Sequence, residues 1–297
     1  MDAVFQPGPE MGSSRSNCAA VFAGGRMVVF GGESGGPPSN TTDLLDAETM
    51  VFQPGPSLLV PRCGCAAVQI DSNRVLVVGG FGLETTGILH LTNFTLKLGN
   101  CMKSARCCAA AVALDSRRIL ILGGRGSNWS ALKSTEILSL DTMDFTAGPD
   151  LPSPRSGCAA VALDEFRFLI AGGSSGTDCL ATTEILDVRT LTFSKGPTMR
   201  SQRSGCAAVN VDELHILVLG GECTGDILSS TELLNLYTMA FTAGPNMRTA
   251  RKGCAAARID AGKPRILVIG GDDGVSGMDT TEVLSLEDDR SRRKLSN

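Results

Sequence analysis

Short apolar runs that end in a pair of glycines recur along the chain at a nearly constant spacing. The first glycines of successive pairs lie 48, 44, 49, 48 and 50 residues apart. The six pairs are Gly31-Gly32, Gly79-Gly80, Gly123-Gly124, Gly172-Gly173, Gly220-Gly221 and Gly270-Gly271. Within a run such as residues 118–122 the apolar residues are consecutive, which indicates a strand buried on both faces. The pattern predicts six units of about 48 residues, each built around one central strand.

Three further landmarks occur in the same order in the units and predict three more strands. In the fourth unit a small-residue stretch, residues 155–161 (R-S-G-C-A-A-V), precedes the apolar run. The sequence T-T-E-I-L follows the run, and F-x-x-G-P ends most units. Four short strands in a repeat of roughly 40 to 50 residues are typical of a propeller blade. We therefore predict an all-β fold, a six-bladed β-propeller of four-stranded antiparallel blades, with strands a to d in chain order.

The two ends of the chain predict how the ring closes. The last unit stops after residues 281–284 (T-E-V-L), whereas the chain starts with residues 5–9 (F-Q-P-G-P), which form a strand d without a unit of its own. We expect this N-terminal strand to complete the sixth blade, so that residues 1–286 form the propeller. Residues 287–297 are charged and poor in apolar residues, which predicts a disordered tail. Around Ser296 the tail resembles a basophilic kinase site, although a solubilising end is the simpler interpretation.

These landmarks together resemble those of kelch repeats. The double glycine after an apolar strand, the Arg-Ser-Gly before the next unit and the period are all similar, from Phe5 to about Leu286. Kelch units usually carry Tyr in strand c and Trp in strand d, whereas this chain has Leu and Phe there. The resemblance implies a protein-interaction module that binds a segment of a protein or peptide partner.

The resemblance also implies a role for six arginines, one at the start of each unit. Kelch domains of the adaptor type bind acidic peptides through arginines of Arg-Ser-Gly motifs. By that resemblance a ligand with carboxylates or phosphates would contact Arg15, Arg62, Arg106, Arg155, Arg203 and Arg251. A structural role is the alternative that we favour for most of them, through pairing with the strand-c acids Asp43, Glu136, Glu184, Glu232 and Glu282. Because the second unit has Gly87 at that place, Arg62 is a stronger candidate for ligand contact, together with Arg106.

Variable loops between strands b and c indicate where a binding surface could lie. In a four-stranded meander the b–c and d–a connections emerge at one end of the propeller, and the b–c loops differ in every unit. The only Trp, Trp129, lies in the third of these loops near Arg125, and Phe81 opens the second. This composition is typical of an interface hot spot. The alternative is that Trp129 folds back over its own blade.

Charge and hydropathy bear on the classes of partner. The chain has 27 Lys and Arg against 31 Asp and Glu, a net charge of −4, which gives no electrostatic reason to bind nucleic acid or anionic membranes. No apolar run approaches the roughly 18 residues of a membrane span. No secretory signal is visible at the start, so we expect a cytoplasmic protein, or a nuclear one, that is monomeric.

Chemistry-bearing residues are few, so we expect no enzyme and neither cofactor nor metal. There are two His and one Tyr, and neither His adjoins a candidate nucleophile. The alternative is a propeller enzyme that uses the loop carboxylates of Asp226, Asp272 and Asp273. Five cysteines occupy one equivalent position near the predicted axis, where a small apolar side chain fits; they are Cys18, Cys65, Cys158, Cys206 and Cys254. We expect them to be reduced structural residues.

Overall fold

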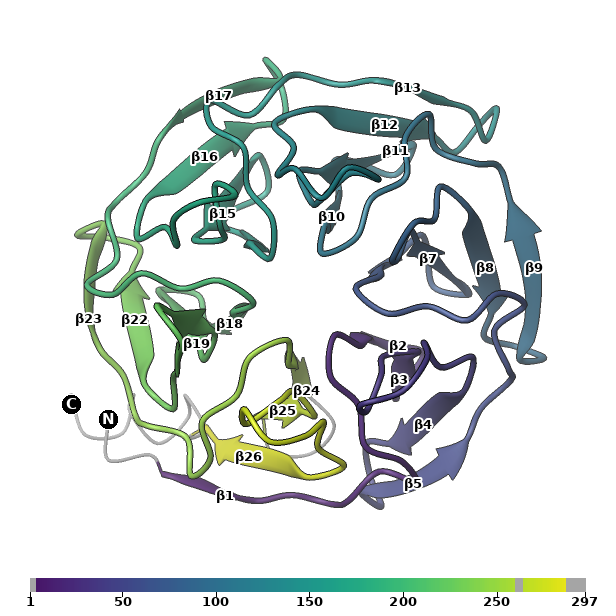
Figure 1. Ribbon diagram of the computed structural model, residues 1–297, viewed down its shortest axis with the longest axis horizontal. Coiled ribbons are helices and arrows are strands. Elements are labelled where there is room, and N and C mark those ends of the chain that lie inside the picture. The colour runs from purple at the N-terminus through teal and green to yellow at the C-terminus, as the bar shows by residue number, and fades with distance from the viewer. Residues whose placement is uncertain (1–3, 260–263, 287–297) are drawn as a thin grey trace, which may run out of the picture.

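Each predicted unit forms one antiparallel sheet, and the six sheets are arranged radially around a central channel (Figure 1). The structure, a computed structural model, describes residues 4–259 and 264–286, and every regular element in these ranges is a strand. The first three blades contain β2 (Ala19–Ala23), β3 (Arg26–Phe30), β4 (Thr42–Asp46) and β5 (Val51–Pro54); β6 (Ala66–Gln69), β7 (Arg74–Val78), β8 (Thr86–His90) and β9 (Thr95–Gly99); and β10 (Ala110–Ala113), β11 (Arg118–Leu122), β12 (Thr135–Ser139) and β13 (Phe145–Ala147). The predicted six-bladed propeller is confirmed.

The other three blades repeat this meander. They contain β14 (Ala159–Ala162), β15 (Arg167–Ala171), β16 (Thr183–Asp187) and β17 (Thr192–Lys195); β18 (Ala207–Asp212), β19 (His215–Leu219), β22 (Thr231–Asn235) and β23 (Ala240–Ala243); and β24 (Ala255–Ile259), β25 (Arg265–Ile269), β26 (Thr281–Ser285) and β1 (Phe5–Pro7). A short hairpin in the b–c loop of the fifth blade adds β20 (Glu222–Cys223) and β21 (Asp226–Ile227). Strands a, with their small side chains, line the channel, and strands d lie at the rim (Figure 1).

The core lies between the blades. Strand b is enclosed by strands a and c within its sheet and by a neighbouring blade on each face, so four consecutive residues of β11, from Ile119 to Leu122, are fully buried. One buried cluster joins Phe30 and Val28 of the first blade to Val75 and Val77 of the second, and similar clusters fill the other junctions. Because both faces of strand b are covered, its apolar residues are consecutive. A sheet with one face in solvent would instead show alternating apolar and polar residues.

The N-terminal strand closes the ring as predicted. β1 pairs antiparallel with β26, with Phe5 opposite Leu284 and Pro7 opposite Glu282. The Phe5 side chain is fully buried against Leu284 and Leu217, so it occupies the position that the outer-strand Phe occupies in other units. The bounds 1–286 that we gave for the propeller stay a prediction. The predicted tail, with Ser296, lies outside the described residues, and no helix in the described part is long and apolar enough to span a membrane.

Two closed rings of backbone hydrogen bonds hold the blades together at the b–c end. In the outer ring the second glycine of each pair donates to the carbonyl of the next unit's arginine, as from Gly124 to Arg155 at 2.8 Å. The inner ring joins the third residue of each R-S-G-type motif to its counterpart in the next unit, at 2.7–2.8 Å; its members are Asn17, Gly64, Cys108, Gly157, Gly205 and Gly253. All six have positive φ, between 52° and 68°. This inner ring fixes the rim of the channel on which the candidate site is built.

Candidate binding surface at the channel mouth

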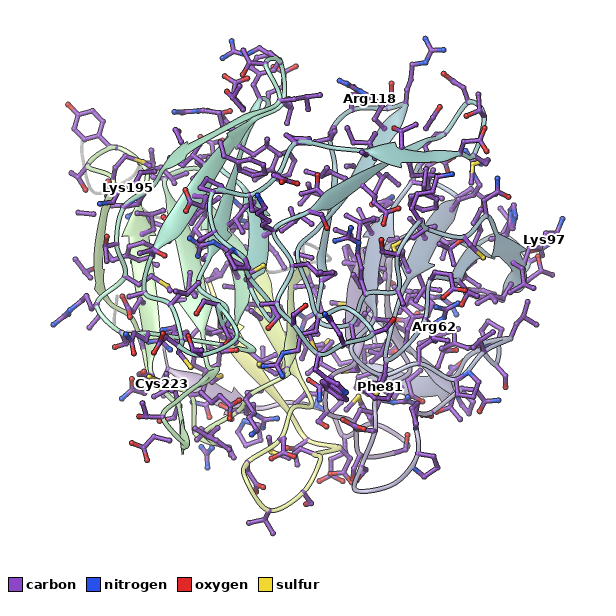
Figure 2. The ribbon with its side chains drawn as sticks, turned by 45° about the horizontal axis from the view of Figure 1, so that its top comes forward. Arg62, Phe81, Lys97, Arg118, Lys195 and Cys223 are labelled. Atoms are coloured by element: carbon purple, nitrogen blue, oxygen red, sulfur yellow. The ribbon has the colours of Figure 1, made fainter. Side chains whose placement is uncertain are left out.

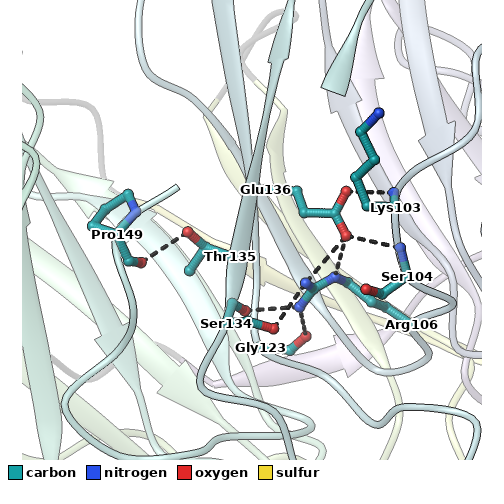
Figure 3. Close-up of polar contacts among 8 residues, drawn as sticks. All are labelled: Lys103, Ser104, Arg106, Gly123, Ser134, Thr135, Glu136 and Pro149. Atoms are coloured by element: carbon teal, nitrogen blue, oxygen red, sulfur yellow. Dashed lines mark hydrogen bonds and ion pairs between the residues drawn. The ribbon is translucent and has the colours of Figure 1, made fainter. Parts of the chain in front are cut away.

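The six repeated arginines lie inside the blades. Their relative exposure is 0–2%, and each guanidinium bonds to the end of strand b and the start of strand c. In the third blade, Nη1 of Arg106 donates to the carbonyls of Gly123 at 3.0 Å and Ser134 at 2.7 Å, and Nη2 donates to the Ser134 hydroxyl at 2.9 Å (Figure 3). The arginine therefore ties three strands of one blade together at the point where they leave the sheet.

Strand-c carboxylates complete this arrangement in five blades. The ion pairs join Arg15 to Asp43, Arg106 to Glu136, Arg155 to Glu184, Arg203 to Glu232 and Arg251 to Glu282, at 2.8–3.2 Å. Glu136 also accepts hydrogen bonds from the backbone amides of Lys103 and Ser104, at 2.7 and 3.1 Å (Figure 3). The same carboxylate thus fixes the d–a loop that leads into the blade.

This placement corrects the expectation that the arginine ring faces a ligand. Five of the six charges are neutralised within their own blades, and all six side chains are buried. Arg62 is the exception predicted from Gly87: it donates to the carbonyls of Gly79 and Thr85 and to the Thr85 hydroxyl, but no carboxylate of the described residues pairs with it. Burial lowers the pKa of Arg62. Arg62 and Arg106, our preferred candidates, are therefore framework residues like the others.

A ring of variable side chains surrounds the mouth of the channel. In five blades the residue after the glycine pair forms an antiparallel bridge with the residue after the arginine, and in the second blade the Phe81 amide donates to the Cys63 carbonyl at 2.9 Å. The six residues after the glycine pairs are Glu33, Phe81, Arg125, Ser174, Glu222 and Asp272. Similar backbone geometry therefore presents side chains of five different types at one surface. The sequence analysis did not identify Glu33, Glu222 and Cys107 as members of this surface. For Glu33 and Glu222 an indication was present, since the residue directly after the repeated Gly-Gly pair varies from unit to unit.

Two aromatic rings from neighbouring blades meet on this surface. Trp129 lies in the turn after Arg125 with φ of 63°, and its ring centroid lies 4.7 Å from that of Phe81, with the planes tilted by 48°. Trp129 is 56% exposed and Phe81 is 48% exposed. Figure 2 shows Phe81 at the same end of the propeller as Cys223 and opposite Arg118. Trp129 thus reaches across to the second blade, as the hot-spot interpretation requires, and leaves both rings accessible.

Two adjoining cavities lie beside this aromatic pair. One, of about 350 Å³, is lined by Phe81, Trp129, Glu33, Pro38 and the cysteines Cys63, Cys107 and Cys108. The other, of about 360 Å³, lies over the channel and includes Trp129, Arg125, Glu222, Lys252 and Asp272. The first is mainly apolar and the second is polar. Together they are of the size in which proteins bind side chains and small ligands.

The charges around the mouth are arranged in distinct ways. Arg125 is partly buried, and its Nε donates to the Ser156 hydroxyl of the fourth blade at 3.2 Å. Lys252 pairs with Glu222 at 2.7 Å. Glu33 accepts a hydrogen bond from the Asn17 side chain at 3.1 Å, and no ion pair is formed by it in the described part of the chain. Of the seven arginines singled out from the sequence, Arg125 alone contributes to this surface.

The loop carboxylates of the enzyme alternative have local roles in the structure. Asp272 accepts from the amide of Gly274 at 2.6 Å, and Asp273 accepts from the amides of Val275 and Ser276 at 2.9 and 3.1 Å. These amide bonds hold the pKa of Asp273 below its ordinary value. A general acid would instead need a raised pKa. Within residues 4–259 and 264–286, no group of three His, Cys, Asp or Glu is placed to hold a metal ion.

The cysteines fall into two groups. All five channel cysteines that we predicted as structural residues are 7–8% exposed. Burial raises the thiol pKa of each to about 11 or 12. Cys107 differs, because a hydrogen bond from the Cys108 thiol and the nearby Arg125 guanidinium lower its pKa to about 7. Burial raises the pKa of the neighbouring Cys63 to about 12. Cys107 thus differs from the channel cysteines in having a lowered thiol pKa, and it lines both cavities.

We expect the alkylation of Cys107 by iodoacetamide to rise with a midpoint near pH 7, because the thiolate is the reactive species. Peptide-level mass spectrometry with fragmentation would separate it from Cys108. Arg125→Gln should move the midpoint to higher pH, whereas Arg117→Gln, a change at the other end of the propeller, should leave it in place. A midpoint near the ordinary thiol value in the unaltered protein would contradict the assignment.

Comparison with protein families agrees with the architecture. The Kelch motif model matches residues 14–59 and 154–200, which contain the first and the fourth blade. No curated protein matches the chain. The four blades between and after these matches share the glycine pair, the buried arginine and the strand order of the matched ones. The two matched blades and the six-bladed architecture are thus consistent with a kelch-repeat β-propeller.

Proposed function

We propose that this propeller is a protein-interaction module that docks a segment of a partner protein across its b–c and d–a loop face, over Phe81 and Trp129. Kelch propellers are typically non-catalytic interaction modules. The observation that carries the proposal is the exposed aromatic pair beside a cavity at the channel mouth. Aromatic side chains at the centre of a patch supply much of the binding energy of protein interfaces. Arg125 lies at the edge of the same patch.

The expectation of an acidic partner loses its basis in this structure. It depended on six arginines that would present positive charge at the mouth, and those guanidinium groups are buried, five of them with their own carboxylates. Around the mouth, Glu33, Glu222 and Asp272 outnumber Arg125 and Lys252. The proposal keeps a protein or peptide partner and assigns its docking to the aromatic pair.

The proposal places the module in a reducing compartment, the cytoplasm or the nucleus. All eleven cysteines are free, and the five that line the channel are buried with their thiols protonated. A monomer suffices for this function, because both aromatic rings and the whole cavity belong to one chain.

Affinity purification from cell extract with the Phe81→Ala, Trp129→Ala double variant tests this proposal. We expect partners recovered with the unaltered protein to be lost with the variant, while its melting temperature stays close to that of the parent, because both rings are about half exposed. Tyr237→Ala is the matched control, since Tyr237 is 89% exposed in a c–d turn at the other end of the propeller. Equal recovery with the double variant and the control would refute the proposed face.

A further inference from the structure

Glu33 is a carboxylate of the mouth that has no cationic partner among residues 4–259 and 264–286. It lies at the position after the glycine pair of the first blade and is partly buried. Its Oε1 accepts from the Asn17 side chain at 3.1 Å, and none of the ion pairs of the described residues includes it. The equivalent acid of the fifth blade, Glu222, is paired with Lys252 at 2.7 Å. The same ring position thus holds one carboxylate with an ion-pair partner and one without such a partner among the described residues.

The unpaired carboxylate lines the same cavity as the aromatic pair. Glu33, Phe81 and Trp129 all border the cavity of about 350 Å³, and Glu33 is the only Asp, Glu, Lys or Arg among the residues that line it. The two rings are tilted by 48° with centroids 4.7 Å apart, so they form two walls of an angle rather than a flat surface. An aromatic face attracts a cation that lies within about 6 Å of its centroid. A carboxylate beside two such faces is a combination suited to a positive group.

The remaining charges near the cavity favour the same sign of ligand. Arg125 borders only the polar cavity, and its Nε is held by Ser156 on the fourth blade. Cys107 borders the apolar cavity, and a hydrogen bond from the Cys108 thiol lowers its pKa. An acidic side chain in this cavity would lie close to Glu33 and would be repelled by it, while the Arg125 guanidinium borders the adjoining cavity.

We propose that the cavity between Phe81, Trp129 and Glu33 takes a basic side chain, an arginine or a lysine, of the docked partner segment. The proposal rests on the function proposed above and names the chemistry that the surface selects. The aliphatic part of the basic side chain packs against the aromatic rings, and its charged end reaches the free Glu33 carboxylate. The affinity accordingly falls as salt is added, because much of the selectivity is electrostatic.

Trp129 is the only tryptophan of the chain and lines this cavity and the adjoining polar one, so its fluorescence reports on ligands at the channel mouth. The probes are three capped tripeptides, acetyl-Gly-Arg-Gly-amide and its Lys and Glu counterparts, titrated at constant ionic strength. We expect a saturable change of Trp129 emission with the Arg and Lys peptides and none with the Glu peptide. Glu33→Gln should weaken the binding of the basic peptides by about tenfold, since it removes the charge and keeps an acceptor for Asn17.

Glu222→Gln is the matched control for net charge. It removes one negative charge from the same ring of residues, but that charge is already paired with Lys252, so we expect peptide affinity to change less than about twofold. Equal weakening by both variants, or no saturable response to either basic peptide, would overturn the assignment of a basic ligand. If the Glu peptide saturates instead, or if partners still depend on Phe81 and Trp129 without depending on Glu33, the docking face stands and the basic class is wrong.

Discussion

Arg203→Met should lower the free energy of unfolding by about 3–5 kcal/mol, the loss expected when one partner of a buried ion pair is removed. Arg203 is fully buried, and its guanidinium donates to the carbonyls of Gly220 and Ser230, to the Ser230 hydroxyl and to Glu232. Methionine fills much of the volume but donates nothing. Glu232, 2% exposed, would remain as a buried charge without its cation. Urea denaturation followed by circular dichroism would measure the loss.

The second blade provides a matched variant that isolates the role of the carboxylate. Arg62→Met removes the same bonds to the glycine carbonyl and to Thr85, but Gly87 leaves no carboxylate behind. We expect it to cost about 1–3 kcal/mol, the range for unsatisfied buried polar groups. Equal losses for Arg203→Met and Arg62→Met would show that the carbonyl bonds alone, and not the ion pair, account for the role of the arginine.

The fold could be predicted because its physical causes repeat along the sequence. A continuous apolar run is required wherever a strand is covered on both faces, and six such runs at one period leave few architectures other than a propeller. The closure by β1 was also predictable, since Phe5 belonged to an outer strand without a unit and Leu284 to a unit without an outer strand. The order of the strand motifs along the chain was enough to predict this closure.

The site was predictable only in part, because one pattern fits two roles. An arginine and an acid that recur once in every unit are compatible with an internal ion pair and also with a charged binding ring. Whether the arginine side chain points into the blade or toward the channel mouth decides between the two roles. The contact between Phe81 and Trp129 depends on the left-handed backbone of Trp129, with φ of 63°, which nothing in the local sequence demands. Glu33 became a candidate only because no cationic side chain of the described residues pairs with it, and such pairing depends on how the blades are assembled.

Gly123→Ala should destabilise the propeller by about 3–5 kcal/mol, through left-handed strain and a backbone collision together. Gly123 has φ of 61°, and a Cβ there would lie 2.3 Å from the Arg155 carbonyl oxygen. That oxygen accepts the bond from Gly124 that joins the third blade to the fourth, at 2.8 Å. The contact is backbone to backbone, so relief requires the two blades to separate.

Gly25→Ala separates the collision from the strain, because Gly25 has φ of 74° and a Cβ there would meet no atom within 4 Å. It should therefore cost only the left-handed penalty, about 1 kcal/mol. Thermal and urea unfolding of both variants would measure the difference between them. If Gly123→Ala cost no more than Gly25→Ala, the blades would have to tolerate a shift of the Arg155 carbonyl, and the outer hydrogen-bond ring could not be what holds them in place. A difference of about 2 kcal/mol or more would instead make close approach between blades, rather than turn geometry, the reason that each apolar run must end in glycine.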